Sequence, residues 1–129
     1  MPDDTAQFSA DVIAYLRTQR LGRLATVDPT GAPQNNPVGF RYNPDTGTID
    51  IGGRNMGASR KFRNLAGNPR VAFVVDDLAS VQPWRVRCVE IRGRAEGLTD
   101  ADFGPGYSGE IIRIYPERII AFGLDPAPA

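Results

Sequence analysis

The chain has 129 residues, enough for one domain with a single hydrophobic core and too few for two. Its 15 basic residues balance its 15 acidic residues, which excludes the strong overall field that draws proteins to nucleic acids or anionic membranes. Histidine is absent and cysteine occurs once, so Ser/His/Asp catalysis, Cys/His catalysis, a structural zinc site and an internal disulfide are excluded. If the protein is an enzyme, its chemistry therefore depends on a cofactor.

The ends of the chain carry few structural signals. We expect a single domain over residues 1–129, with frayed tails at 1–8 and 125–129. The first residues lack the basic and apolar regions of a secretory signal, and no apolar run reaches the roughly 18 residues of a membrane span. These features favour a soluble, cytoplasmic protein.

The first part of the chain predicts one helix and three strands. Ser9 can cap a helix over about 9–19, and apolar residues recur on one face of it. An alternating strand over 21–27 leads into the turn at 28–31, which has proline second and glycine fourth, as in many tight turns. A second strand over about 33–42 and a third over 48–52 complete an antiparallel meander.

Two asparagines and a proline interrupt the second of these strands. Asparagine is depleted in strands, and Pro37 cannot donate a hydrogen bond to a neighbouring strand. The sequence Asn35-Asn36-Pro37 therefore indicates a sheet edge, a bulge or a binding position; the alternative is an irregular strand entry with two solvated amides.

The segment 54–65 combines four cations with the start of a helix. Gly52 and Gly53 allow close backbone approach or positive φ. After them, Ser59 can cap a helix whose buried side carries Phe62, Leu65 and Ala66. Asn68 and Pro69 end this helix.

The positions of the cations on this helix suggest an anion site. Arg60 and Lys61 lie in the first turn, where the helix dipole is already positive, and a bound phosphate would resolve that conflict. Lys61 is also the single lysine beside fourteen arginines. The alternative is a solvated basic face.

The second half of the chain is predominantly strand. The almost continuous apolar run at 70–77 predicts a central strand, followed by a loop at 78–83 and a long strand over 84–98 that bends near Gly93. The glycine-rich segment 99–109 predicts a loop. Two further strands are expected at 110–115 and 118–122, separated by Pro116 and Glu117.

These elements predict a mainly β fold with a few short helices. Short hairpin connections, and helices too few to cover a parallel sheet, favour an antiparallel barrel over a doubly wound α/β fold. The chain has neither a P-loop nor a G-x-G-x-x-G motif after a strand, so nucleotide binding by those routes has no support.

Several short motifs follow one another in a characteristic order. They are RLGRLATV (20–27), DPTGAPQ (28–34), PVGF (37–40), SRKFRNL (59–65), NPRVAFVVD (68–76), PWRVR (83–87), EIRGRAE (90–96) and RIYPERI (113–119). Their order and spacing resemble those of the pyridoxamine 5′-phosphate oxidase-like superfamily of flavin and deazaflavin oxidoreductases. The likeness covers about residues 9–124 and is greatest to the branch of deazaflavin-dependent enzymes.

This resemblance implies a split β-barrel of the FMN-binding-protein type, a homodimer, and a cofactor bound in a groove at the dimer interface. Asn36, Pro37 and Val38 would line the cofactor ring, near Gly52, and the segment Ser59-Arg60-Lys61 would hold its phosphate. The chain lacks the C-terminal Arg- and His-rich segment that handles the pyridoxal ring in the oxidases proper, which argues against pyridoxamine oxidation.

The resemblance implies that two further residues, Arg54 and Trp84, contact the cofactor at the edges of the site. Arg54 would contact the acidic tail of a deazaflavin coenzyme, although a solvated loop arginine is the alternative. Trp84 would reach the cofactor of the partner subunit, or else serve as an ordinary core or interface tryptophan.

The resemblance implies an oxidoreductase in which the reduced deazaflavin coenzyme F(420) delivers hydride to a small unsaturated organic substrate. FMN is the alternative cofactor, because Lys61 serves a terminal phosphate equally well. A non-catalytic flavin or deazaflavin carrier or sensor is the alternative from another class.

Overall fold

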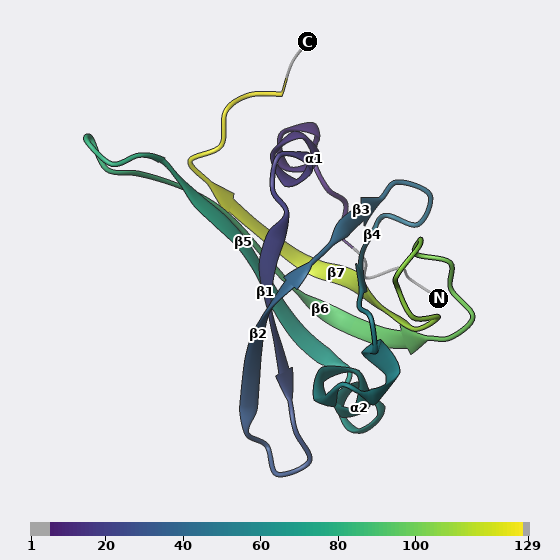
Figure 1. Ribbon diagram of the computed structural model, residues 1–129. Coiled ribbons are helices and arrows are strands. Elements are labelled where there is room, and N and C mark those ends of the chain that lie inside the picture. Colours follow the sequence, from purple (N-terminus) through teal and green to yellow (C-terminus); the bar gives the residue numbers. More distant parts are fainter. Residues whose placement is uncertain (1–5, 128–129) are drawn as a thin grey trace.

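The computed structural model describes residues 6–127 and contains one antiparallel sheet with two short helices beside it (Figure 1). The strands follow the order β2-β1-β5-β6-β7-β4-β3 across the sheet. The elements are α1 (Ala10–Arg17), β1 (Leu21–Val27), β2 (Pro33–Gly39), β3 (Arg41–Asn43), β4 (Thr48–Gly52), the 3-10 turn η1 (Met56–Ala58), α2 (Arg60–Gly67), β5 (Arg70–Ser80), β6 (Arg85–Leu98) and β7 (Ile111–Phe122). The expected mainly β, antiparallel class is confirmed.

The two edges of the sheet are formed by consecutive pieces of chain. β2 pairs with β1 at one edge and β3 pairs with β4 at the other, yet only Phe40 separates β2 from β3. The sheet therefore curls back towards itself into a barrel. The single strand predicted over 33–42 has the right extent, but the chain changes its pairing partner at Phe40, whose ring packs edge-to-face on Phe73 with centroids 5.3 Å apart.

Alternating side chains fill the inside of the barrel. On β5, Val71, Phe73 and Val75 are buried and the residues between them are more exposed, as the strand period of two requires. Helix α1 adds Val12, Tyr15 and Leu16 to the core, and the Ser9 hydroxyl accepts a hydrogen bond from the Val12 N–H, as its predicted role as a cap requires.

The bend predicted at Gly93 is confirmed and explains why β7 does not break. The register between β6 and β7 shifts at Arg92/Gly93, where Gly93 lies opposite Pro116. A Cβ at Gly93 would lie 2.1 Å from the carbonyl oxygen of Tyr115, so only glycine fits. The prediction of two strands separated by Pro116 and Glu117 was wrong, because a bulge accommodates a proline without ending the strand.

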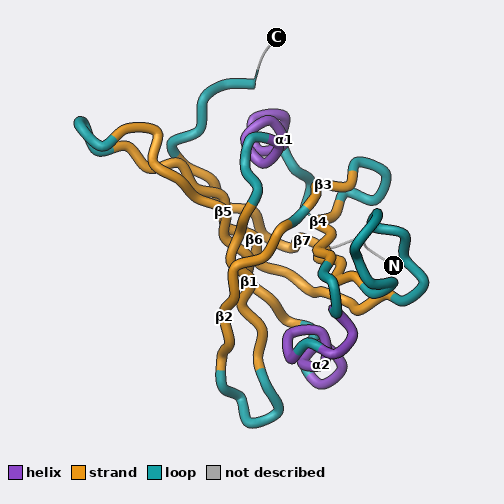
Figure 2. Tube along the Cα trace, viewed as in Figure 1, coloured by secondary structure: helices purple, strands orange, loops and turns teal. Residues whose placement is uncertain are grey.

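The loop predicted at 78–83 was also wrong in extent. β5 continues through Leu78 to Ser80, and the chain turns at 81–84 before β6 begins. The resulting β5–β6 hairpin projects beyond the body of the barrel (Figure 1). By contrast, the segment 99–110 is a loop without helix or strand, as expected, and lies beside β4 and β7 (Figure 2).

Parts of both predicted tails contact the barrel. The Ala6 N–H donates to the Pro116 carbonyl at 2.7 Å, and the Phe8 ring packs edge-to-face on Tyr42. The Ala127 N–H donates to the Asp11 carboxylate at 2.7 Å. Ala6, Phe8 and Ala127 thus make contacts, and the expectation of frayed tails at 1–8 and 125–129 stays a prediction; residues 1–5 and 128–129 lie outside the described part. No helix within residues 6–127 is both long and apolar enough to cross a membrane.

Candidate functional site

The first turn of α2 offers donors to a ligand. Ser59 caps the helix: its hydroxyl accepts from the Phe62 N–H at 3.3 Å and donates to the Met56 carbonyl at 2.6 Å. Within the described residues the backbone N–H groups of Arg60 and Lys61 have no acceptor. Two N–H donors at the positive end of a helix dipole favour an anion there.

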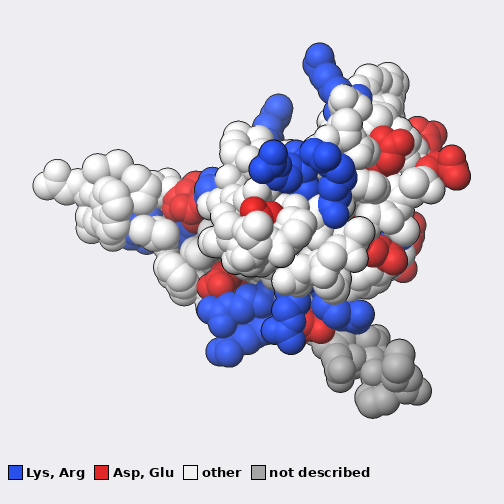
Figure 3. All heavy atoms as spheres, turned by 90° about the horizontal axis from the view of Figure 1, so that it is seen from below, with Lys and Arg blue, Asp and Glu red and all other residues white. Residues whose placement is uncertain are grey.

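The cations of segment 54–65 form no close ion pairs in the described part of the chain. Among residues 6–127, Arg54, Arg60, Lys61 and Arg63 form no ion pair, whereas arginines on β1, β6 and β7 pair with nearby carboxylates. The side chain of Lys61 is half-buried, and those of Arg54, Arg60 and Arg63 are exposed. Seen from the side of α2 and the β1–β2 turn, basic side chains form separate groups with uncharged surface between them (Figure 3). The positive charge is therefore local, as the balanced composition predicts.

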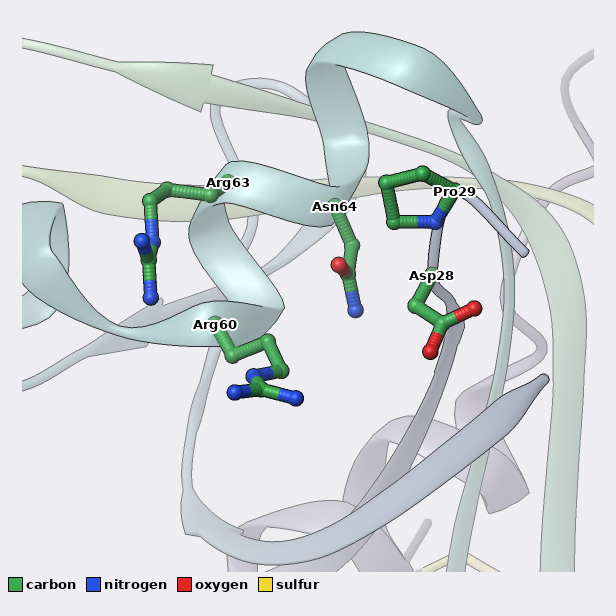
Figure 4. Close-up of a pocket in the computed structure, with 5 residues that line it drawn as sticks. All are labelled: Asp28, Pro29, Arg60, Arg63 and Asn64. Atoms are coloured by element: carbon green, nitrogen blue, oxygen red, sulfur yellow. The ribbon is translucent and has the colours of Figure 1, made fainter. Parts of the chain in front are cut away.

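A pocket of about 240 Å³ lies between α2 and the β1–β2 turn, and its lining residues are Asp28, Pro29, Arg60, Arg63 and Asn64. In Figure 4 the side chains of Arg60 and Asp28 extend into the same space, and that of Arg63 lies further along the helix surface. We call it the α2 pocket.

Asp28 is an acidic neighbour that sequence reasoning did not place here. Its carboxylate accepts hydrogen bonds from the Thr30 hydroxyl, the Ala32 N–H and the Thr30 N–H, and these bonds lower the pKa of Asp28. Asp28 therefore stays charged near neutral pH and balances part of the charge of Arg60. This leaves Lys61 and the free N–H groups as the donors for an anion that no acid opposes.

Asn64 fixes the position of α2 against the sheet. Its Nδ2 atom donates to Thr26 Oγ1 on β1 and to Gln34 Oε1 on β2, both at 3.0 Å. Asn64 is buried and Ala66 is exposed, so the prediction that Ala66 belongs to the buried side was wrong. The two polar partners come from distant strands, and nothing local in the sequence identifies them.

The predicted ring-binding strand lies at the sheet edge. β2 pairs with β1 alone, so the edge indicated by Asn35-Asn36-Pro37 is confirmed. Asn36 lies on the same side of the strand as Gln34 and Val38. The Gln34 side chain accepts a hydrogen bond from α2, and Val38 belongs to the core, but Asn36 is exposed. The barrel wall is therefore open at Asn36, between the part of β2 that contacts α2 and the part that enters the core.

A second pocket continues from the end of β2. It has a volume of about 360 Å³ and is lined by Gln19, Arg20, Gly39, Phe40, Arg41, Gly52, Phe103 and Tyr107. It brings Gly52, at the end of β4, next to the residues that follow Val38. Arg41 and Phe103 were not predicted as site residues, because the irregular segment 99–109, which brings Phe103 to Arg41, carries no pattern that indicates its path. We call it the aromatic pocket.

The two remaining predicted residues, Arg54 and Trp84, line neither of these pockets. Arg54 is exposed in the loop between β4 and η1. Trp84 is 68% exposed at the tip of the β5–β6 hairpin, far from α2 (Figure 1). No group of three His, Cys, Asp or Glu side chains that could hold a metal ion occurs in the described part of the chain.

Comparison with known proteins identifies the family. Residues 8–125 match the pyridoxamine 5′-phosphate oxidase family. The chain is 49% identical, over 92% of its length and 84% of the relative's, to a 5a,11a-dehydrotetracycline/5a,11a-dehydrooxytetracycline reductase from Streptomyces rimosus subsp. rimosus.

Solved structures show the same fold. A conserved hypothetical protein from Mycobacterium tuberculosis superposes with a TM-score of 0.71, 21% identity and coverage of 95% of this chain and 89% of that one. An FAD-binding protein from Mesorhizobium loti gives a TM-score of 0.64, 22% identity and coverage of 89% and 94%. The curled antiparallel sheet thus matches the split-barrel structures. With these findings and the matched residues 8–125, the chain belongs to the pyridoxamine 5′-phosphate oxidase family, whose members bind flavin-type cofactors.

Proposed function

We propose that this protein is a reductase that binds the deazaflavin coenzyme F(420) and uses it to reduce a conjugated double bond of a small organic substrate. The observation that carries the proposal is the 49% identity, over 92% of the chain, with the dehydrotetracycline reductase. A dehydrotetracycline or a related polycyclic compound is accordingly the first substrate to test.

The start of α2 suits the phosphate of such a coenzyme. The N–H groups of Arg60 and Lys61 and the ammonium of Lys61 provide charge-assisted hydrogen bonds without a competing carboxylate. Ser59 contributes by fixing the first turn, since its hydroxyl is already bonded to Phe62 and Met56. Arg54, which is exposed and follows Gly53, would meet an acidic extension of the coenzyme.

The exposed edge of β2 suits a flat heterocyclic ring. Because β2 pairs on one side only, half of its backbone donors and acceptors face the other way, and a ring edge with C=O and N–H groups can pair with them. Asn36 adds a side-chain amide at the opening, and Pro37 and Val38 add apolar surface. From Gln34, which bonds to α2, to Phe40, in the aromatic pocket, the strand spans about 20 Å. This length accommodates a phosphate at α2, its linker and the ring in one groove.

The side chains of the site bind and orient, and the cofactor supplies the reactive group. When bound, a reduced deazaflavin supplies the hydride. The residues of β2 and Gly52 would hold the ring against the sheet, and Phe40 and Phe103 would exclude water from its far end. No side chain is needed as nucleophile or base, which agrees with the absence of histidine.

We further propose that the protein acts as a homodimer in which the β5–β6 hairpin covers the partner's cofactor groove. Large apolar side chains are exposed along this hairpin, with Val81 69% and Trp84 68% accessible. Apolar side chains at the end of a projecting arm favour burial against another chain. Trp84 would then approach the partner's cofactor. Sedimentation equilibrium of the protein and of Trp84→Ser tests this, and an unchanged monomer in both would contradict it.

A steady-state assay tests the proposed activity. Protein, reduced F(420) and a dehydrotetracycline are mixed, and oxidation of the coenzyme and formation of reduced product are followed together. We expect one product molecule for each coenzyme oxidised. Tight coenzyme binding without turnover of this substrate or a panel of conjugated ketones would favour the carrier or sensor, and turnover with reduced FMN alone would favour a flavin enzyme.

A further inference from the structure

The aromatic pocket has a distinct chemical character. Three of its eight lining residues, Phe40, Phe103 and Tyr107, are aromatic, two are arginines, Arg20 and Arg41, and none is acidic. Its volume of about 360 Å³ is within the range of small-molecule sites. Flat apolar walls with unopposed cations favour a ligand that is itself flat and negatively charged.

Arg41 is held in a defined position by the aromatic rings. Its guanidinium carbon lies 3.8 Å from the centroid of the Phe103 ring and 5.5 Å from that of Tyr107. It forms no ion pair among residues 6–127. Arg41 also lines the adjoining pocket, whose acidic residues are Asp50, which is bonded to Arg113, and Asp102. A guanidinium stacked on rings keeps its in-plane N–H groups available for a planar anion.

The rings are in turn fixed by the loop at 101–109. The Ser108 N–H donates to the Gly53 carbonyl at 2.8 Å, and the Met56 N–H donates to the Ser108 hydroxyl at 3.1 Å. Phe103 lies so close over Gly52 that a Cβ there would be 2.4 Å from its ring. The loop is therefore attached to the same residues that lead from β4 to the expected phosphate site.

The aromatic pocket also lies next to the expected position of the cofactor ring. Gly39 and Phe40 follow Val38 directly along the chain, and Gly52 belongs to both regions. A ligand in this pocket would lie at the end of the groove opposite to Lys61. This is the place for the molecule that reacts with the ring.

We propose that the aromatic pocket binds the substrate, and that the substrate is a planar conjugated molecule with an ionised enol, phenol or carboxylate that pairs with Arg41. This rests on the proposed function, which it extends by assigning the substrate site and the charge of the substrate. Arg41 acts as a specificity-determining residue: it attracts the anion, and Phe103 and Tyr107 contact the flat surface.

Binding of a matched pair of probes tests the proposal. Anthracene-2-carboxylate and neutral anthracene-2-carboxamide are titrated by fluorescence into the full chain, with and without F(420). The wild type should bind the carboxylate about tenfold more tightly than the amide. Arg41→Gln should remove this preference and leave the amide affinity unchanged, and Arg41→Lys should keep part of it. Arg118→Gln, at an exposed arginine of β7 that lines no pocket described above, is the control and should bind as wild type does.

The results separate this inference from the proposed function. Equal affinities for carboxylate and amide in the wild type, or a preference that survives in Arg41→Gln, would overturn the inference even if F(420) binds and turnover is observed. Failure of F(420) to bind the wild type would overturn the proposed function, whereas the probe titrations without coenzyme would still decide whether the pocket selects planar anions. If Arg41→Gln unfolds, the titration of Arg41→Lys tests the inference instead. Lysine retains the positive charge, so loss of the preference for the carboxylate over the amide in this variant would also contradict an ionic contact.

Discussion

Replacing Arg113 with methionine tests its buried ion pair with Asp50, which joins β7 to β4. Asp50 lies two residues before Gly52. Nε and Nη2 of Arg113 donate to the two carboxylate oxygens of Asp50 at 2.9 and 3.0 Å. The Asp50 side chain is 8% exposed and that of Arg113 is 21% exposed. Methionine keeps most of the apolar stem and removes the charge, so the change isolates the guanidinium.

The expected loss is about 3 kcal/mol at pH 7. Removing one partner of a buried pair costs about 3–5 kcal/mol, because the other charge stays buried. Asp50 still accepts hydrogen bonds from Asn43 Nδ2 and Thr48 Oγ1, both at 3.0 Å, which places the loss at the lower end of that range.

The pH dependence of this loss provides an internal check. Burial alone raises the pKa of Asp50, but hydrogen bonds from Arg113, Asn43 and Thr48 outweigh it and leave the pKa below its usual value. In the wild type the stabilisation is therefore present above the unfolded-state pKa of about 4 and is lost as the pH falls through the folded-state pKa. In the variant the effect of burial is expected to dominate, so Asp50 takes up a proton at a higher pH and the penalty diminishes on acidification.

Urea unfolding followed by circular dichroism at pH 7 and pH 4 measures both effects. We expect a smaller difference between wild type and Arg113→Met at pH 4 than at pH 7. Arg118→Met, on the same strand but exposed, should change the free energy of unfolding by no more than about 0.5 kcal/mol. A loss below about 1 kcal/mol at pH 7, or an equal loss at both pH values, would refute the reasoning.

Two further changes test the bulge and the attachment of α2. Gly93→Ala places a Cβ 2.1 Å from the Tyr115 carbonyl oxygen, so one of the two strands must shift. Urea unfolding should show a free energy of unfolding lower by about 2 kcal/mol or more. Gly67→Ala, where a Cβ meets nothing within 4 Å, is the matched control, and equal urea midpoints for the two variants would contradict this explanation of the bulge. Asn64→Ala leaves Thr26 and Gln34 without their shared donor and should lower the free energy of unfolding by about 1–3 kcal/mol. Asn35→Ala, at an exposed position of β2, is the control. If Asn64→Ala destabilises the protein no more than Asn35→Ala does, these hydrogen bonds do not fix α2 to the sheet.

The sequence predicted the elements that depend on a few neighbouring residues, namely helix caps, a tight turn and a bend at glycine. Ser9 and Ser59 were identified as caps because a cap depends on the next three residues, and both helices begin where expected. The β1–β2 hairpin follows from Asp28-Pro29-Thr30-Gly31, and the bend from Gly93. The motif order predicted the family and the oxidoreductase class, and the comparisons confirm both.

The errors and omissions concern pairings between distant residues. Pro116 continues a strand because β7 forms a bulge at Glu117, opposite Arg92 and Gly93 of β6, which the sequence around Pro116 does not reveal. Asn64 is buried because partners on β1 and β2 accept its hydrogen bonds. The aromatic pocket was missed because Arg41 and Phe103 meet only after the loop at 101–109 is attached to Gly53. The roles of Asn36, Pro37, Val38, Gly52, Arg54, Ser59, Arg60, Lys61 and Trp84 in cofactor binding stay predictions.

Calorimetric titration with F(420) and with FMN, repeated on Lys61→Ala and on the control Arg118→Gln, tests whether the start of α2 holds the phosphate of the cofactor. We expect the wild type and Arg118→Gln to bind F(420) with the same affinity. We also expect Lys61→Ala to lose roughly 1.5–3 kcal/mol of binding free energy, or about 10- to 150-fold in affinity, because it loses a charge-assisted phosphate contact. Equal binding of F(420) by wild type and Lys61→Ala would contradict the claim that the start of α2 holds the phosphate of the cofactor.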